Sequence, residues 1–344
     1  MDKLTIRILS MENVMNLYKG KSNLVFSIVE DAFKKWTDGK VLMPAKSSQI
    51  FDQKTQNRIN CMPSSLLPDG VSGVKLVSVF PTNASKGLQN VTGIMLLSEI
   101  NSGFPIAVID GTLLTSIRTA AVGCVAAKYL APSHVEKVGF IGAGREARMH
   151  FVLLKALFPN IKECRISSRS QETVQGFINE FKPFINDVDY VDCAGDSDLS
   201  VRDVDIIITA ISGQCPVLKA YAITKGALYI HVGGWEDEFN VVRKADKIIC
   251  DDWDSCKHRT QTISRMYMDG LLNDNDIYAN LGDIITGKKK GRANDDEFIY
   301  FNSVGLSFID LSFANETYKL AIKNEIGEDF VIQSNNKIDY CALI

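Results

Sequence analysis

The sequence of 344 residues lacks several signatures of particular protein classes. Its eight cysteines form no C-x-x-C pair and no histidine stands at zinc-finger spacing, so neither a zinc site nor a disulfide framework is expected. A net charge of −3 provides no positive field for nucleic acid. The N-terminus lacks the apolar core of a signal peptide, and no uninterrupted apolar run reaches the ~18 residues of a membrane span. We therefore expect a cytoplasmic protein that binds no metal, nucleic acid or membrane.

The sequence does contain enough apolar material for two packed domains, since 46% of its residues are apolar. Between 136 and 300, short apolar runs alternate with longer helical patterns, which predicts right-handed crossovers and a doubly wound, mostly parallel Rossmann-type sheet. The N-terminal third has strand patterns at hairpin spacing, which predict an antiparallel or mixed sheet. We expect an α/β fold with an N-terminal α+β substrate-binding and dimerisation domain (1–117, completed by 313–344) and a Rossmann domain (118–312).

A glycine-rich turn, VGFIGAGREARMHF, opens the parallel domain. Its G-x-G-x-x-A pattern follows an apolar strand and begins a helix. In a dinucleotide site Gly142 permits the tight turn, Gly144 lets a pyrophosphate approach the backbone, and Ala147 lets the helix pack on the strand. The alternative is a turn that only serves packing, but the strand-turn-helix context favours the cofactor. The predicted contacts are Gly142, Ala143, Gly144, Arg145, Glu146 and Ala147.

The second strand of this domain ends in RISSRSQ, without the carboxylate that would accept from the ribose 2′-OH of NAD. Ser168, Arg169 and Ser170 instead offer a guanidinium fork and two hydroxyls, which suit a 2′-phosphate. We therefore predict that NADP(H) is favoured over NAD(H). The alternative is that Arg169 is an ordinary surface residue of a loop.

Two further stretches, GTLLTSIRTAAVGCVAAKYLAP and FNSVGLSFIDLS, flank the Rossmann pattern. Together with SGVKLV and the glycine turn, they make the chain resemble the ornithine cyclodeaminase and mu-crystallin family over nearly its whole length. The resemblance implies a homodimer with a nicotinamide cofactor and a small amino, imino or keto acid as substrate. It places Lys75 beside the substrate α-carbon and Arg118 on the substrate carboxylate, with Lys46 as a second basic contact.

The same resemblance places Thr92, Thr119, Val304 and Gly305 along the cofactor. The predicted contacts also include Thr209, Ala210 and Val232, and the predicted substrate pocket comprises Asn60, Met62, Trp235 and Glu236.

Elementary chemistry supports the two central assignments. A carboxylate substrate needs a planar cationic fork, and a reacting amine or imine needs a proton donor, so Arg118 and Lys75 are suitable residue types. The pattern GVKLVSV also fits Lys75 as an outward-facing strand residue. Arg118 is alternatively a member of a salt bridge, although its helix is otherwise almost uncharged, which favours an anionic partner or ligand.

Two positions depart from the cyclodeaminase pattern. Asn60 stands where those enzymes have a Glu for the δ-amino end of ornithine, and Trp235 stands where they have an Asp for ring closure. Glu236 and Asp237 follow at once and are candidates to replace the missing Asp, but we interpret the acidic run as the N-terminus of a helix.

These features predict an NAD(P)-dependent oxidoreductase of amino acid metabolism, an imine reductase or amino-acid dehydrogenase. In this reaction hydride passes between the nicotinamide and a substrate α-carbon. The alternatives are a cyclodeaminase-type lyase that recycles bound NAD, and a mu-crystallin-like protein that binds the cofactor without catalysis.

Overall fold

The computed structural model describes residues 3–211, 213–334 and 340–343. The chain divides into two compact units, a first unit of residues 1–21, 39–115 and 307–344 and a second unit of residues 22–38 and 116–306. Helix α2 (Ser22–Thr37) lies in the N-terminal third of the sequence but belongs to the second unit, where it packs against α10 (Leu281–Ile285). The predicted domain limits, 1–117 with 313–344 and 118–312, stay a prediction.

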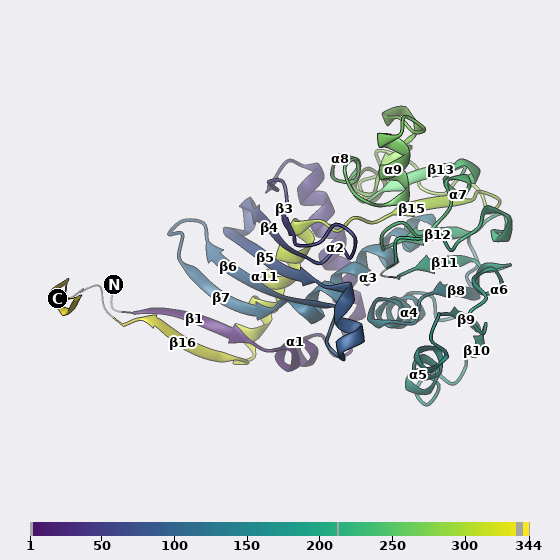
Figure 1. Ribbon diagram of the computed structural model, residues 1–344. Helices are drawn as coiled ribbons and strands as arrows, with labels where there is room; N and C mark the ends of the chain where they lie inside the picture. The colour runs from purple at the N-terminus through teal and green to yellow at the C-terminus, as the bar shows by residue number, and fades with distance from the viewer. Residues whose placement is uncertain (1–2, 212, 335–339, 344) are drawn as a thin grey trace. The chain divides into compact units, whose positions relative to one another are not determined.

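The first unit is built on a mixed sheet whose described strands follow the order β16-β1-β7-β6-β5-β4-β2, with β3 also paired to β4 (Figure 1). Only the pairing of β1 with β7 is parallel, which agrees with the predicted antiparallel or mixed sheet. The strands are β1 (Leu4–Leu9), β2 (Val41–Leu42), β3 (Ser47–Ile50), β4 (Arg58–Leu66), β5 (Val71–Val79), β6 (Val91–Glu99), β7 (Pro105–Asp110) and β16 (Glu328–Gln333).

Two helices of the first unit pack on this sheet. Helix α1 (Met11–Tyr18) begins at a capping box formed by Ser10 and Asn13, which satisfies the first free N–H groups of the helix. Helix α11 (Ser307–Lys323) lies along β4, β5 and β6 and presents buried Phe308, Leu311 and Phe313. Strand β4 alternates between buried and partly buried residues because one face meets the helix. The face that α11 covers is the one that carries Lys75.

The second unit contains an all-parallel sheet, in the order β10-β9-β8-β11-β12-β15-β13-β14 among the described strands (Figure 1). This confirms the predicted Rossmann-type sheet, in which short buried strands alternate with helices. The strands are β8 (Lys137–Ile141), β9 (Glu163–Ser167), β10 (Asp189–Asp192), β11 (Ile206–Thr209), β12 (Leu228–His231), β13 (Lys247–Cys250), β14 (Ala279–Asn280) and β15 (Ile299–Asn302). The remaining helices are α4 (Arg145–Leu157), α5 (Gln171–Phe181), α6 (Ser197–Val201), α7 (Phe239–Lys244), α8 (Trp253–Cys256) and α9 (Thr262–Met268).

Helix α3 (Gly111–Leu130) begins in the first unit and continues in the second. Among the described residues it is the one helix long and apolar enough to cross a membrane, but 83% of its apolar window is buried inside the protein. Its all-round apolar character is therefore that of a core helix. The guanidinium of Arg118 is held within this apolar setting.

Candidate active site and dinucleotide turn

The glycine turn forms the connection that the sequence predicts, from the end of β8 into α4. Gly142 has a φ of 110°, and a Cβ atom there would lie 2.6 Å from the backbone oxygen of Ala210, so both the conformation and the close approach require glycine. The Gly142 N–H donates to the carbonyl of Ser167 at 2.8 Å. Ala147 is fully buried against the sheet, as the third small residue of such a turn must be.

Gly144 differs from Gly142 because a Cβ atom at this position would meet no atom within 4 Å. Gly144 is also the N-cap residue of α4, and it provides no side chain to satisfy the first N–H groups of that helix. Open space and uncapped N–H donors at a helix N-terminus are what a pyrophosphate needs. The residues present therefore fit a dinucleotide.

Strand β9 ends with buried Ser167, and the next residues stand where a cofactor ribose is read in this fold. Ser168 is half-buried and Arg169 is exposed. Ser170 is the N-cap residue of α5, and its hydroxyl accepts from the Thr173 N–H at 3.3 Å. One of the two predicted hydroxyl contacts is thus engaged in capping, which leaves Ser168 and Arg169 as the principal candidates.

Other predicted cofactor residues divide between the two units. Thr92 is exposed on β6 in the first unit, whereas Thr119 is buried in the second. The Thr209 side chain is buried, with its hydroxyl 2.8 Å from Tyr229 Oη and 2.6 Å from a carboxylate oxygen of Glu236. The Thr209 side chain therefore takes part in hydrogen bonds within the interior of the unit. Val232, another predicted cofactor contact, is half-buried directly after β12.

Arg118 and Gly305 lie together in the second unit. Gly305 has a φ of 80°, and a Cβ atom there would lie 2.9 Å from Nη1 of Arg118, whose side chain is almost fully buried. The backbone N–H groups of Val304 and Gly305 donate to the Asp251 carboxylate at 2.8 and 3.0 Å. The predicted carboxylate-binding arginine is therefore seated on a glycine whose turn is fixed by a buried acid.

Lys75 is buried in the first unit, so the alternative of an outward-facing strand residue is wrong. Its Nζ lies 2.6 Å from Oδ1 of Asp310 on α11, and the two side chains are 1% and 2% exposed. Met62 is the cross-strand partner of Lys75, and Asn60 occupies the next position on the same face of β4. Asn60 is buried and accepts from the Ser48 hydroxyl at 2.8 Å.

The first unit therefore brings Lys75, Met62 and Asn60 to one face of its sheet. Lys46 is half-buried directly before β3 of the same unit. Asp310 was missed by sequence reasoning, although a carboxylate in the apolar stretch FIDLS is a usable signal. The argument that a lone charge in an apolar helix needs a partner, used for Arg118, applies equally to Asp310.

The acidic run after Trp235 does lead into a helix N-terminus, since Glu238 is the N-cap residue of α7, but Glu236 and Asp237 precede the helix and lie in the interior. Both carboxylates are fully buried. Glu236 accepts from the Ile211 N–H at 2.6 Å, the Gly233 N–H at 2.9 Å and the Thr209 hydroxyl. Burial raises the pKa of Glu236, while these hydrogen bonds and nearby His231 act in the opposite direction. Glu236 therefore holds together the loops that follow β11 and β12.

Asp237 accepts from the Thr262 hydroxyl at 2.6 Å and lies 3.4 and 3.3 Å from the hydroxyls of Tyr229 and Tyr300. Burial also raises its pKa. Both acids thus belong to a buried polar network of the second unit.

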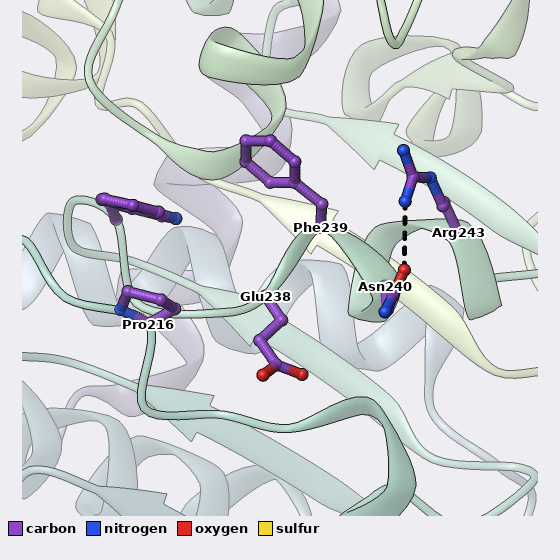
Figure 2. Close-up of a pocket in the computed structure, with 6 residues that line it drawn as sticks. Pro216, Glu238, Phe239, Asn240 and Arg243 are labelled. Carbon is purple, nitrogen blue, oxygen red and sulfur yellow. Dashed lines mark hydrogen bonds between the residues drawn. The ribbon is translucent and has the colours of Figure 1, made fainter.

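Trp235 is half-buried and lines an open pocket of about 300 Å³ in the second unit. The guanidinium of Arg265 lies 4.6 Å from its ring centre, and its indole N–H has no hydrogen-bond partner among the described residues. The pocket also contains Pro216, Glu238, Phe239, Asn240 and Arg243, and Figure 2 shows the hydrogen bond between the last two. None of these residues is a predicted proton donor or carboxylate contact.

A parallel sheet with a pyrophosphate-compatible glycine turn, accompanied by a buried lysine and a buried arginine, defines a nicotinamide-dependent enzyme of small charged substrates. The model of the ornithine cyclodeaminase/mu-crystallin family matches residues 6–325. The chain belongs to this family.

Among curated relatives, the alanine dehydrogenase of Archaeoglobus fulgidus is 31% identical over 331 residues, which cover 93% of this chain and 96% of the relative. The Delta(1)-pyrroline-2-carboxylate reductase of Bacillus cereus is 30% identical and covers 98% and 100%. This chain is accordingly an enzyme of the family and an oxidoreductase of the amino-acid and imino-acid class.

Two solved structures match the whole fold. The Thermococcus litoralis Delta(1)-pyrroline-2-carboxylate reductase in complex with NADH and L-proline has a TM-score of 0.88 and 29% identity, covering 94% of this chain and 99% of the other. An archaeal alanine dehydrogenase dimer with bound NAD has a TM-score of 0.86 and 30% identity, covering 95% and 99%. A nicotinamide cofactor is thereby confirmed, whereas these relatives give no support for a preference for NADP.

Proposed function

We propose that this protein interconverts a small amino acid and its imino or keto acid, with Arg118 and Lys46 on the substrate carboxylate and Lys75 as proton donor or acceptor. The observation that carries the proposal is the burial of Lys75 against Asp310. Its Nζ also lies 3.5 Å from the Thr115 hydroxyl, and an ammonium held in this way has a fixed position from which a proton can be passed to a reacting nitrogen.

A bound nicotinamide would supply hydride to the substrate α-carbon or accept it from there. In the reductive direction Lys75 would give a proton to the imine nitrogen as the carbon is reduced. In the oxidative direction Lys75 would begin as the neutral amine and take the proton from the substrate nitrogen. Arg118 and Lys46 fix the carboxylate, so that the α-carbon is presented in one orientation, and this positioning supplies much of the rate enhancement.

The rival lyase reaction is disfavoured at the same two positions where the sequence departs from cyclodeaminases. Asn60 is neutral and engaged with Ser48, and Trp235 cannot act as a base. Glu236, the nearest acid to Trp235 in sequence, has its carboxylate committed to two backbone N–H groups and Thr209. A substrate with a cationic end such as ornithine lacks an anionic partner at these positions.

The reaction type is tested by mixing the protein with reduced nicotinamide cofactor and one of two kinds of substrate. The first kind is a keto acid together with an amine, and the second is a cyclic imine. Cofactor absorbance and ammonia are followed together. Net oxidation of the cofactor supports the oxidoreductase. Ammonia release from ornithine or lysine without net cofactor consumption would show the lyase, and tight cofactor binding without turnover would show a binding protein of the mu-crystallin type.

The proposal includes a preference for NADP(H), supported by Ser168 and Arg169 and by the absence of an acid at the end of β9. Dissociation constants for NADPH and NADH, measured by fluorescence, test it. Arg169→Ala is expected to weaken NADPH binding by about tenfold, the value of one charge-assisted contact, and to leave NADH binding unchanged. Arg202→Ala, another exposed arginine of the second unit, is the control. Equal binding of both cofactors by the native protein would refute the preference.

The proposal also includes a homodimer and a cytoplasmic location. On the sheet face opposite Lys75, the cross-strand neighbours Leu76 and Ile94 are 42% and 48% exposed. An apolar sheet face of this kind is typical of a protein interface. The archaeal alanine dehydrogenase relative is a dimer. Sedimentation of the native protein, and of Leu76→Lys with Ile94→Lys, tests whether this face forms the dimer.

A further inference from the structure

Asp251 is a buried acid that the proposed reaction does not use. It follows β13 directly, and β13 pairs with β15 in a register that places Cys250 beside Asn302. The residues after both strands therefore emerge side by side at the carboxyl edge of the parallel sheet, the edge where ligands bind in this type of fold. Asp251 is 1% exposed.

The carboxylate of Asp251 organises the turn after β15. Its Oδ2 accepts from the Ser303 hydroxyl at 3.2 Å, the Val304 N–H at 2.8 Å and the Gly305 N–H at 3.0 Å. Its Oδ1 accepts from the Asp252 N–H at 2.9 Å. A single side chain thus fixes three consecutive residues, 303 to 305.

Gly305, the last residue of this turn, lies against the guanidinium of Arg118. Because the Cβ position of Gly305 lies 2.9 Å from Nη1 of Arg118, a shift of this turn by a few tenths of an ångström changes the space that the guanidinium occupies. Gly305 adopts its positive φ without steric cost, and its N–H donates to Asp251, which fixes the orientation of this peptide group.

We propose that Asp251 is a positioning residue that fixes the Ser303–Gly305 turn and, through Gly305, the guanidinium of Arg118. The inference rests on the proposed role of Arg118 as the contact of the substrate carboxylate. It requires an ionised carboxylate, because three donors converge on one oxygen. An amide has one acceptor oxygen and one N–H₂ donor group. The N–H₂ group would therefore face either the three donors that now bind Oδ2 or the Asp252 N–H that binds Oδ1.

The same geometry gives the position a dependence on pH. Burial raises the pKa of Asp251 to about 6, against the lowering by its backbone hydrogen bonds. The titratable and charged groups that face it are Asp252, which raises its pKa further, the Cys256 thiol at 3.8 Å and the guanidinium of Arg259. Below this pKa the protonated carboxyl has lost acceptor capacity, so the turn is expected to loosen as the pH falls.

The first test compares Asp251→Asn with Asp252→Asn. Asp252 is the N-cap residue of α8, where Asn caps equally well, so this neighbour is a matched control. At saturating cofactor, Asp251→Asn is expected to raise KM for the best carboxylate substrate by about tenfold or more, since a small misplacement weakens an oriented contact. An unchanged KM in a folded Asp251→Asn protein would overturn the inference.

A double-mutant cycle with Arg118→Ala tests whether the effect passes through the arginine. If it does, Asp251→Asn adds little to KM once Arg118 is gone. An equal increase in both backgrounds would show that the turn acts elsewhere, for example on the cofactor, and would overturn the link to Arg118. If Arg118→Ala itself leaves KM unchanged, the proposed function of Arg118 fails instead, so the two failures are distinguishable.

The native protein provides a measurement that needs no folded variant at Asp251. L-lactate, a carboxylate without an amine, is used as a competitive inhibitor between pH 5 and 8. Its inhibition constant is expected to rise as the pH falls through about 6, the pKa of Asp251, and to be constant above it. Arg118→Ala should abolish this dependence. An inhibition constant that does not change with pH in the native protein would overturn the inference.

Discussion

The buried pair of Lys75 and Asp310 makes a sharp prediction about stability and activity together. Its Nζ to Oδ1 distance is 2.6 Å, and the two side chains are 1% and 2% exposed. With an effective dielectric constant of about 20, the attraction at this distance is about 6 kcal/mol, and the cost of removing both charges from water offsets much of it. The net contribution of the pair to the free energy of folding is therefore close to zero, whereas burying either charge without the other is unfavourable.

Lys75→Met and Asp310→Leu are expected to lower the free energy of unfolding by about 3–5 kcal/mol each, because each removes the oppositely charged partner of a buried charge. The double variant replaces both charges by apolar groups and is expected to fall within about 2 kcal/mol of the native protein. Urea unfolding followed by circular dichroism measures all four proteins. The difference between the double variant and the sum of the single variants is the coupling free energy.

Activity separates the role of the pair in folding from its role in chemistry. The double variant should fold well, bind the cofactor and have no hydride-transfer activity, since the proton donor is absent. The exposed pair of Lys34 and Asp31, at 53% and 65% exposure, is the control, and its removal should change stability very little. Additive, small losses for the buried pair, or an active double variant, would refute the reasoning.

Gly144→Val is expected to fold, because a Cβ atom there meets no atom within 4 Å, and to lose dinucleotide binding in a fluorescence titration. An unchanged dinucleotide affinity would refute the assignment of this turn as the cofactor site. His150 is fully buried, and burial lowers its pKa to about 4. The unfolded chain takes up the proton near pH 6.5, so stability should be lost as the pH falls from about 6.5 to 4, by about 3 kcal/mol. Replacing His150 by Leu should flatten the pH dependence of urea unfolding, and exposed His134→Gln should not. The native protein should form negligible proline from ornithine, and Trp235→Asp with Asn60→Glu is the pair expected to introduce some, measured by chromatography. Abundant proline from the native protein would favour the lyase.

The local sequence was sufficient for the features that depend on near neighbours. A strand, two glycines and a small residue in the order of Gly142, Gly144 and Ala147 predicted the dinucleotide turn, because the φ angles and the helix start are set within six residues. Strand patterns at hairpin spacing predicted the mixed sheet, and short apolar strands between helices predicted the parallel one. The family resemblance then supplied Lys75 and Arg118 as candidates.

The partners of those charged residues were decided only by the tertiary structure. Asp310 is 235 residues from Lys75 in sequence, and no periodic pattern relates a strand residue to an acid on a distant helix. The same holds for Glu236 and Asp237, whose acidic run has the composition of a helix start and precedes one, but whose side chains are buried. A charged residue in a sequence indicates that its side chain must either be paired with an opposite charge or be exposed to water. Which of the two occurs depends on long-range packing, and that packing also determines that Asp251 and Gly305 hold Arg118 in place.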